Sequence, residues 1–130
     1  MSRPMNILVI DDDTDLLRGL GIRLISEGYR VTVASNAITA LNVALRGEPD
    51  LILLDLGLPD EDGMRLLSRL KSIQTTSNLP VIVISARDAD WEKDVVAAGA
   101  MAFFQKPVDN DELFATIALA LEEAGAPISG

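Results

Sequence analysis

The feature that most constrains the fold is a set of five short apolar runs, separated by segments with helical spacing. Several of the runs are rich in Val and Ile, and each is about four residues long, which suits strands buried on both faces of a parallel sheet. They cover residues 7–10, 31–34, 51–54, 81–84 and 101–104. Between and after them, apolar residues recur every three or four positions, which predicts a helix after each strand. The alternation therefore indicates one α/β domain with a parallel sheet.

Residues that favour helix ends stand where the predicted helices begin and end. Glycine follows the first, second and fourth apolar stripes, as is typical of a helix C-terminus, at Gly28, Gly47 and Gly99. Asn36 is a candidate N-cap of the second helix. We interpret the acidic runs 60–62 and 88–90 as solvated helix caps.

Composition narrows the chemistry that the chain can perform. Twenty Asp and Glu against 11 Lys and Arg give a net charge of −9. This charge argues against binding to nucleic acid or to anionic membranes, because both need a basic surface. The chain has no Cys and no His, which excludes disulfides, thiol nucleophiles and imidazole catalysis. No apolar run approaches the ~20 residues of a membrane span, and the first residues lack a signal-peptide pattern, so we expect a cytoplasmic domain.

Four of the five predicted strands end in residues that can carry chemistry. The acidic run 11–13 follows the first strand, Asp55 the third, Ser85 the fourth and Lys106 the fifth. The second strand ends without an ionisable group. If the strand order is 2-1-3-4-5, the second strand lies at the edge and the other four ends converge. Ligands of such sheets bind at the switch in strand order, which here falls between the first and third strands.

Converging carboxylates predict a site for a cation and for phosphoryl chemistry. The acids repel one another and raise each other's pKa unless a cation is present. Because only oxygen ligands are available, the cation should be hard, and Mg²⁺ (or Mn²⁺) fits. A carboxylate beside such a cation can accept a phosphoryl group. Lys106 would supply positive charge and Ser85 a hydroxyl for the transferring oxygens.

Four segments together resemble the motifs of response-regulator receiver domains. They are Ile-Leu-Val-Ile-Asp-Asp-Asp at 7–13, Leu-Leu-Asp-Leu-Gly-Leu-Pro-Asp-Glu-Asp-Gly at 53–63, Pro-Val-Ile-Val-Ile-Ser-Ala at 80–86 and Lys-Pro at 106–107. The resemblance runs from about residue 6 to residue 123 and is specific, because all four motifs occur in order in one chain.

The resemblance implies a flavodoxin-like (βα)5 fold, a three-layer sandwich with a five-stranded parallel sheet in the order 2-1-3-4-5. It places a receiver domain over residues 1–124, followed at 125–130 by a tail or the start of a linker. The implied function is that of a phosphoacceptor switch in a two-component signalling system. Its partners would be a sensor histidine kinase or a phosphotransfer protein, and an unknown output domain or protein.

The resemblance also implies a separate role for each acid of the site. Asp55 is the phosphoacceptor. Asp12 and Asp55 are direct metal ligands, with the Gly57 carbonyl as a third protein oxygen, and Asp11 acts largely through water.

The remaining family positions concern switching and phosphoryl lifetime. Ser85 is the switch hydroxyl, and Lys106 pairs with the acceptor carboxylate or the phosphoryl oxygens. The aromatic switch position holds Phe103, which lacks a tyrosine hydroxyl, so packing alone would drive its movement. The two positions that tune phosphoryl lifetime in the family hold Gly57 and Arg87.

Two other functions are alternatives to a phosphoacceptor switch. A haloacid-dehalogenase-like phosphohydrolase also uses an Asp after the first strand with a hydroxyl and a Lys, but its Asp-x-Asp-x-Thr/Val pattern fails at Asp15, and it leaves Asp55 unexplained. A receiver-like interaction domain could act without phosphorylation. Turnover of phosphomonoesters would favour the first, and failure to bind Mg²⁺ or accept phosphoryl the second. We expect no enzyme beyond self-catalysed phosphoryl transfer and slow dephosphorylation.

Overall fold

The apolar runs form the strands of one sheet in a computed structural model that describes residues 3–123. The strands are β1 (Asn6–Ile10), β2 (Arg30–Ala34), β3 (Leu51–Leu54), β4 (Val81–Ser85) and β5 (Ala102–Gln105). The helices are α1 (Thr14–Ser26), α2 (Ala37–Arg46), α3 (Gly63–Ser72), α4 (Glu92–Ala97) and α5 (Asn110–Glu123), with a 3₁₀ turn η1 (Ala89–Trp91) before α4. The predicted tail at 125–130 lies outside the described residues. Within the described part of the chain, no helix is long and apolar enough to cross a membrane.

The sheet has the predicted topology. Its five strands are parallel and lie in the order β2-β1-β3-β4-β5. The switch in strand order therefore falls between β1 and β3, where Ile10 pairs with Leu54 in the ladder. Because the strands are parallel, all their carboxyl ends lie at one edge of the sheet, and the residues that follow them come together there.

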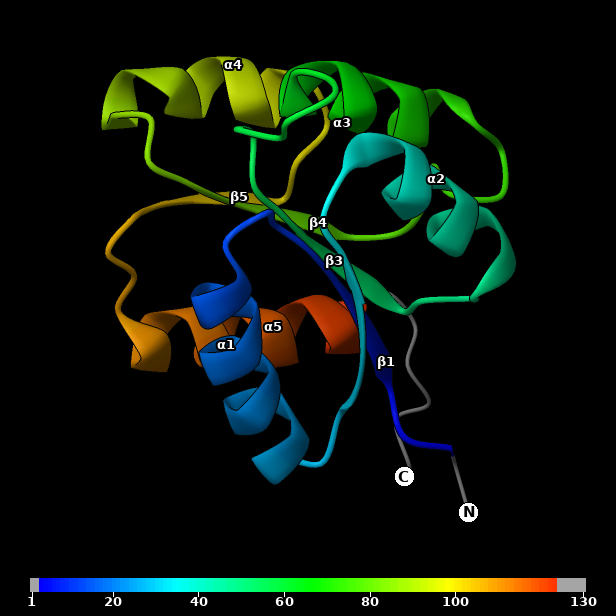
Figure 1. The fold of residues 1–130 in the computed structure, drawn as a ribbon, viewed down its shortest axis with the longest axis vertical. Helices are drawn as coiled ribbons and strands as arrows, with labels where there is room; N and C mark the ends of the chain where they lie inside the picture. The colour runs from blue at the N-terminus through cyan, green and yellow to red at the C-terminus, as the bar shows by residue number, and fades with distance from the viewer. Residues whose placement is uncertain (1–2, 124–130) are drawn as a thin grey trace.

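Helices cover both faces of the sheet and make three layers (Figure 1). The helices α1 and α5 lie on one face, and α2, α3 and α4 lie on the other. Successive residues of β1 point to opposite faces: Leu8 and Ile10 join one buried cluster, and Ile7 and Val9 join the other. All four are at most 2% exposed. Burial on both faces explains why the strands read as unbroken apolar runs.

The acidic run 60–62 does more than cap one helix. Asp62 caps α3, as predicted. Asp60 caps α2 instead, because its carboxylate accepts the Ala37 N–H at 2.8 Å, and this hydrogen bond holds the pKa of Asp60 below its ordinary value. The interpretation of Glu61 as a cap is wrong, because its side chain pairs with Arg69 at 2.8 Å. These contacts fasten the β3–α3 loop to two helices.

The α-helix after β4 is short and is preceded by the 3₁₀ turn η1. Trp91 belongs to η1, and the α-helix proper contains only six residues. Val95 is its one buried residue, so little apolar contact holds this segment against the sheet. Trp91 is 36% exposed, so its ring is a partly buried surface aromatic.

Two glycines provide a test of how closely α3 packs behind the site. A Cβ at Gly63 would lie 2.5 Å from the Leu56 Cα and 2.8 Å from the Asp55 backbone oxygen, so backbone would have to move. We expect Gly63→Ala to destabilise the domain by about 1–3 kcal/mol in urea unfolding. Gly19 lies inside α1, and a Cβ there meets no described atom within 4 Å outside the helix backbone. Gly19→Ala should therefore stabilise by about 0.5–1 kcal/mol. A neutral Gly63→Ala would contradict the packing.

Candidate functional site

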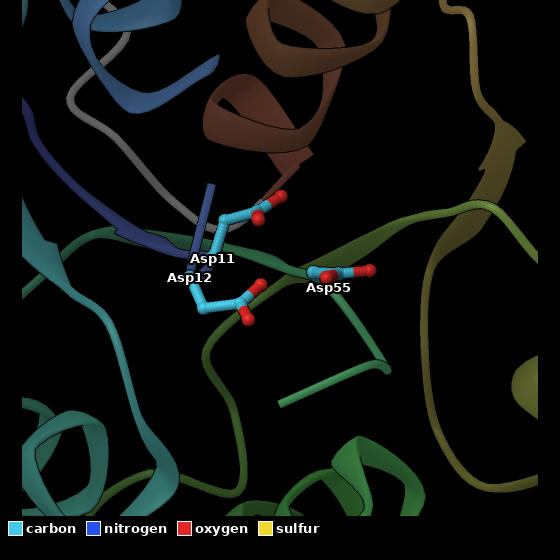
Figure 2. Close-up of side chains that lie close together, drawn as sticks. All are labelled: Asp11, Asp12 and Asp55. Carbon is cyan, nitrogen blue, oxygen red and sulfur yellow. The ribbon is translucent and has the colours of Figure 1, made fainter. Parts of the chain in front are cut away.

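Three carboxylates meet where β1 and β3 end (Figure 2). Asp11 and Asp12 follow β1, Asp55 follows β3, and one oxygen of each lies within 4.8 Å of the other two. Asp11 is 2% exposed and Asp55 is 7% exposed, whereas Asp12 is exposed. The site therefore has a buried inner side and an outer side open to solvent. The structure brings together the three acids that the sequence singled out.

The sheet itself fixes the two buried acids. The Asp55 N–H donates to the Ile10 oxygen at 2.9 Å, and the Asp11 N–H donates to the Ala34 oxygen at 3.1 Å. Both acids thus continue the hydrogen bonding of the strands before them. Because neighbouring strands hold their backbone, the two residues stay close together at the end of the sheet.

Lys106 reaches the acids from the end of β5. Its Nζ donates to Asp11 Oδ2 at 2.8 Å and lies 3.8 Å from Asp55 Oδ2. Burial lowers the pKa of Lys106, but the hydrogen bond to Asp11 and the attraction of both acids raise it by more, so the pKa lies above its ordinary value. Lys106 is therefore charged at neutral pH. Its contact is closer to Asp11 than to the expected acceptor, a detail that the sequence did not reveal.

The site makes Asp55 harder to ionise than a solvent-exposed carboxyl group. Burial raises its pKa most, and repulsion from Asp11 adds to the rise. Lys106 and the backbone N–H of Gly57 lower it by less, so the pKa of Asp55 lies above its ordinary value. A positive charge placed beside Asp55 would favour its ionised form.

The donor set fits a hard divalent cation. The three acids offer only oxygen ligands, their ligand oxygens converge, and one amine is not enough to neutralise them. Gly57 lies beside the acids, since a Cβ there would be 3.7 Å from Asp55 Oδ2. The chain can thus hold a metal ion at this edge of the sheet.

The expected switch residues lie on the neighbouring strands. Ser85 is the last residue of β4, is 1% exposed, and its Oγ accepts the Arg87 N–H at 3.1 Å. Phe103 pairs with Val83 in the β4–β5 ladder and packs, partly buried, against the cluster beneath α2, α3 and α4. A hydroxyl and an aromatic ring thus stand on two strands beside the acids.

One set of contacts at this edge was not predicted. The guanidinium of Arg87 donates to Asp62 at 3.1 Å and stacks over the Trp91 ring at 4.4 Å. Arg87 and Asp62 are 25 positions apart and lie in different loops. No periodicity links two such loops, so the sequence alone carries no signal for this pair.

The fold and the acids define a class: an α/β domain whose acidic switch point fits a phosphoacceptor. Comparison with known proteins gives the family. Residues 7–118 match the model of the response regulator receiver domain, and the chain belongs to that family. The transcriptional regulatory protein GlrR of Escherichia coli is 39% identical over 125 residues, which cover 94% of this chain and 27% of that protein. The chain thus spans about a quarter of that relative's length.

Solved structures agree in fold along nearly the whole chain. A putative response regulator from Chloroflexus aurantiacus is 28% identical, with a TM-score of 0.86 over 92% of this chain and 98% of that chain. The receiver domain of the sensor histidine kinase PA1611 from Pseudomonas aeruginosa, solved with a magnesium ion coordinated in the active site cleft, is 26% identical. Its TM-score is 0.83 over 92% of this chain and 98% of that chain. The chain is therefore a receiver domain of two-component signalling, a signalling module, and the phosphohydrolase alternative is not favoured.

The crowding of the acids predicts that Asp55→Asn stabilises the domain. We expect its melting temperature to exceed that of the wild type by a few degrees in metal-free buffer, because the amide removes a buried negative charge beside Asp11. Since folding raises the pKa of Asp55, the ionised form costs stability above that pKa. The difference should therefore shrink as the pH is lowered from neutrality toward the ordinary Asp pKa of about 4, because Asp55 takes up a proton over this range.

Thermal unfolding across this pH range, with a chelator present, measures the effect. Asp111→Asn, which removes an exposed charge on α5, is the control and should change the melting temperature little. A lower melting temperature for Asp55→Asn at neutral pH would contradict the account.

Proposed function

We propose that this receiver domain is a phosphorylation switch whose phosphoacceptor is Asp55. The observation that carries the proposal is the placement of this carboxylate: it ends a buried strand, is 7% exposed, and lies beside Asp11, Asp12 and the Lys106 amine. A carboxylate oxygen of Asp55 attacks the phosphorus of a phosphohistidine donor. The bond from phosphorus to the imidazole nitrogen breaks, and the departing imidazole takes a proton from solvent.

The residues around Asp55 have distinct parts in this transfer. The ammonium of Lys106 stabilises negative charge on the phosphoryl oxygens. Hydrolysis reverses the modification: water attacks phosphorus, the bond between phosphorus and the Asp55 oxygen breaks, and phosphate leaves. Gly57 presents no side chain to block that water. The domain is thus a self-modifying switch rather than a turnover enzyme.

We assign the metal to the same acids. Asp12, Asp55 and the Gly57 carbonyl would hold Mg²⁺ or Mn²⁺ directly, and Asp11 would act largely through water. The ion, when bound, supplies positive charge that offsets the crowded carboxylates and the incoming phosphoryl oxygens. The magnesium ion coordinated in the active site cleft of the Pseudomonas receiver domain supports this assignment.

The output side of the switch begins at Ser85 and Phe103. A phosphoryl group adds about −1.5 to −2 charge and three acceptor oxygens, which the Ser85 hydroxyl and the Lys106 amine would bind. A switch results only if these contacts differ between two conformations of the surrounding loops. Phe103 lies on β5, beside the strand that ends at Ser85. Because its ring has no hydroxyl, packing alone would drive its change of position.

The partners follow from the family and from charge. The donor would be a sensor histidine kinase or a phosphotransfer protein, and the output would be a further domain or a separate protein. We propose that the domain works in the cytoplasm. Its net charge of −9 makes direct binding to nucleic acid or to anionic membrane unfavourable.

Labelling tests the acceptor. Incubation with phosphoramidate and Mg²⁺ should add one phosphoryl group to Asp55, seen as a single mass increase of the intact protein. Asp55→Asn should remove at least nine-tenths of this adduct, whereas Asp111→Asn should label normally. Full labelling of Asp55→Asn would overturn the assignment, and no labelling of the wild type would favour an interaction domain that works without phosphorylation.

Metal binding tests the ligand set. Mg²⁺ should raise the melting temperature of the wild type, because the cation relieves the repulsion among the acids. Asp12→Asn should weaken Mg²⁺ binding about tenfold or more in a calorimetric titration. Asp13→Asn is the matched control, because it removes one charge at the next position while its side-chain oxygen can still cap α1. Equal affinities for the two variants would contradict the ligand role of Asp12.

A further inference from the structure

We infer that Arg87 is a positioning residue that holds the Ser85 loop in its resting place through the contacts of its side chain with Asp62 and Trp91, which we call the Arg87 latch. The inference rests on the proposed function, because it concerns how Ser85 reaches a phosphoryl group on Asp55. It goes beyond that function by assigning to the resting state a specific set of stabilising side-chain contacts.

The latch joins two loops at the edge of the site. Arg87 lies in the loop between β4 and η1, two residues after Ser85. Its Nη2 donates to Asp62 Oδ1 at 3.1 Å, and its guanidinium lies 4.4 Å from the centre of the Trp91 ring. Asp62 belongs to the β3–α3 loop, which follows Asp55. The side chains of Arg87 and Asp62 are 26% and 47% exposed, so solvent weakens the ion pair without removing it.

The backbone of Arg87 connects the latch to the switch hydroxyl. Its N–H donates to Ser85 Oγ at 3.1 Å. A movement of this hydroxyl toward Asp55 must either break that hydrogen bond or carry Arg87 along. Breaking the bond leaves a part-buried N–H without its partner, and carrying Arg87 along pulls its guanidinium away from Asp62 and Trp91. The latch therefore opposes the movement.

The contacts of the latch are weak enough to break. The second terminal nitrogen of Arg87, Nη1, is buried and has no hydrogen-bond partner among the described residues. A buried guanidinium nitrogen without a partner is costly. In the resting position, the hydrogen-bonding groups of Arg87 are therefore not all satisfied. A partly exposed ion pair and a cation–π contact are each modest. Together they bias the loop without locking it.

The latch predicts a direction of change that a merely structural contact would not give. Removing the latch lowers the cost of moving Ser85, so the switched conformation gains population. Ligands that prefer that conformation should then bind more tightly, although the protein has lost contacts. A purely structural role would instead leave their affinity unchanged or weaken it.

The test compares the binding of beryllofluoride, which stands in for the phosphoryl group on Asp55, at saturating Mg²⁺ by chemical-shift titration. Arg87→Ala should bind about tenfold more tightly than the wild type, equivalent to about 1.4 kcal/mol. Asp62→Asn, which loses the charge of the ion pair but leaves the Trp91 contact, should bind about threefold more tightly. The Met64 N–H and Arg87 Nη2 both donate to Asp62 Oδ1, so Asp62→Asn can keep the helix cap while it removes the negative charge that pairs with Arg87. Arg87→Lys, which keeps the charge but loses the planar stack, should lie between. Arg3→Gln is the control, because it also breaks an Arg–Asp ion pair, the one with Asp50. It should bind beryllofluoride like the wild type.

A second readout uses the single tryptophan of the chain. Beryllofluoride should change the Trp91 emission of the wild type, because the stacked guanidinium leaves. The emission of ligand-free Arg87→Ala should already lie near that of the bound wild type. The double variant Arg87→Ala/Asp62→Asn should bind no tighter than Arg87→Ala alone, because both changes open one latch.

The outcomes separate the latch from the function beneath it. If phosphoramidate labels Asp55 normally but the affinities of Arg87→Ala and Asp62→Asn stay within twofold of the wild type, or fall, the latch is wrong and the proposed function stands. Wild-type Trp91 emission that stays constant at full beryllofluoride occupancy also overturns the latch. If the wild type takes no label and no beryllofluoride, the proposed function fails, and the latch with it.

Discussion

The repulsion between Asp11 and Asp55 is the interaction on which the rest of the site depends. Each acid follows a strand whose hydrogen bonds continue through its backbone N–H, so the sheet holds the two residues close together. Burying two such charges is costly unless a partner offsets them. Lys106, brought in from β5, offsets part of the cost through its 2.8 Å contact with Asp11. The site is therefore short of positive charge, which is the property that makes it receptive to a cation and, with that cation, to a phosphoryl group.

Around this fixed centre, the loops differ in how firmly they are held. Asp60 ties the β3–α3 loop to α2 through backbone N–H groups, and Gly63 packs α3 against the backbone next to Asp55. The loop after β4 has lighter anchors: the hydrogen bond to Ser85 and the side-chain contacts of Arg87. The helix beyond it buries one residue, Val95. A firmly held acceptor beside a lightly held sensing loop is the arrangement that a switch requires, because the modification can then move the loop rather than the acceptor.

Much of this arrangement could be predicted from the sequence. The strands follow from unbroken apolar runs, because burial on both faces leaves no room for alternation. The strand order was predicted from the resemblance to receiver domains, and it agrees with a chemical contrast: the second strand, which ends without an ionisable group, lies at the edge. The convergence of Asp11, Asp12 and Asp55 then follows from parallel strands alone. What the sequence could not show depends on loops: the cap that Asp60 provides for α2, the Glu61–Arg69 pair and the reach of Arg87. Each joins residues whose approach is set by loop geometry, which no periodicity encodes.

The most direct test of the central claim is to locate the phosphoryl group itself. After treatment with phosphoramidate and Mg²⁺, borohydride reduces an aspartyl phosphate to homoserine, which peptide mass mapping places at a single position. We expect homoserine at residue 55, dependent on Mg²⁺, with the side chains of Asp11 and Asp12 unchanged. Homoserine at residue 11 or 12, or its absence from residue 55 in protein that has gained a phosphoryl group, would contradict the account.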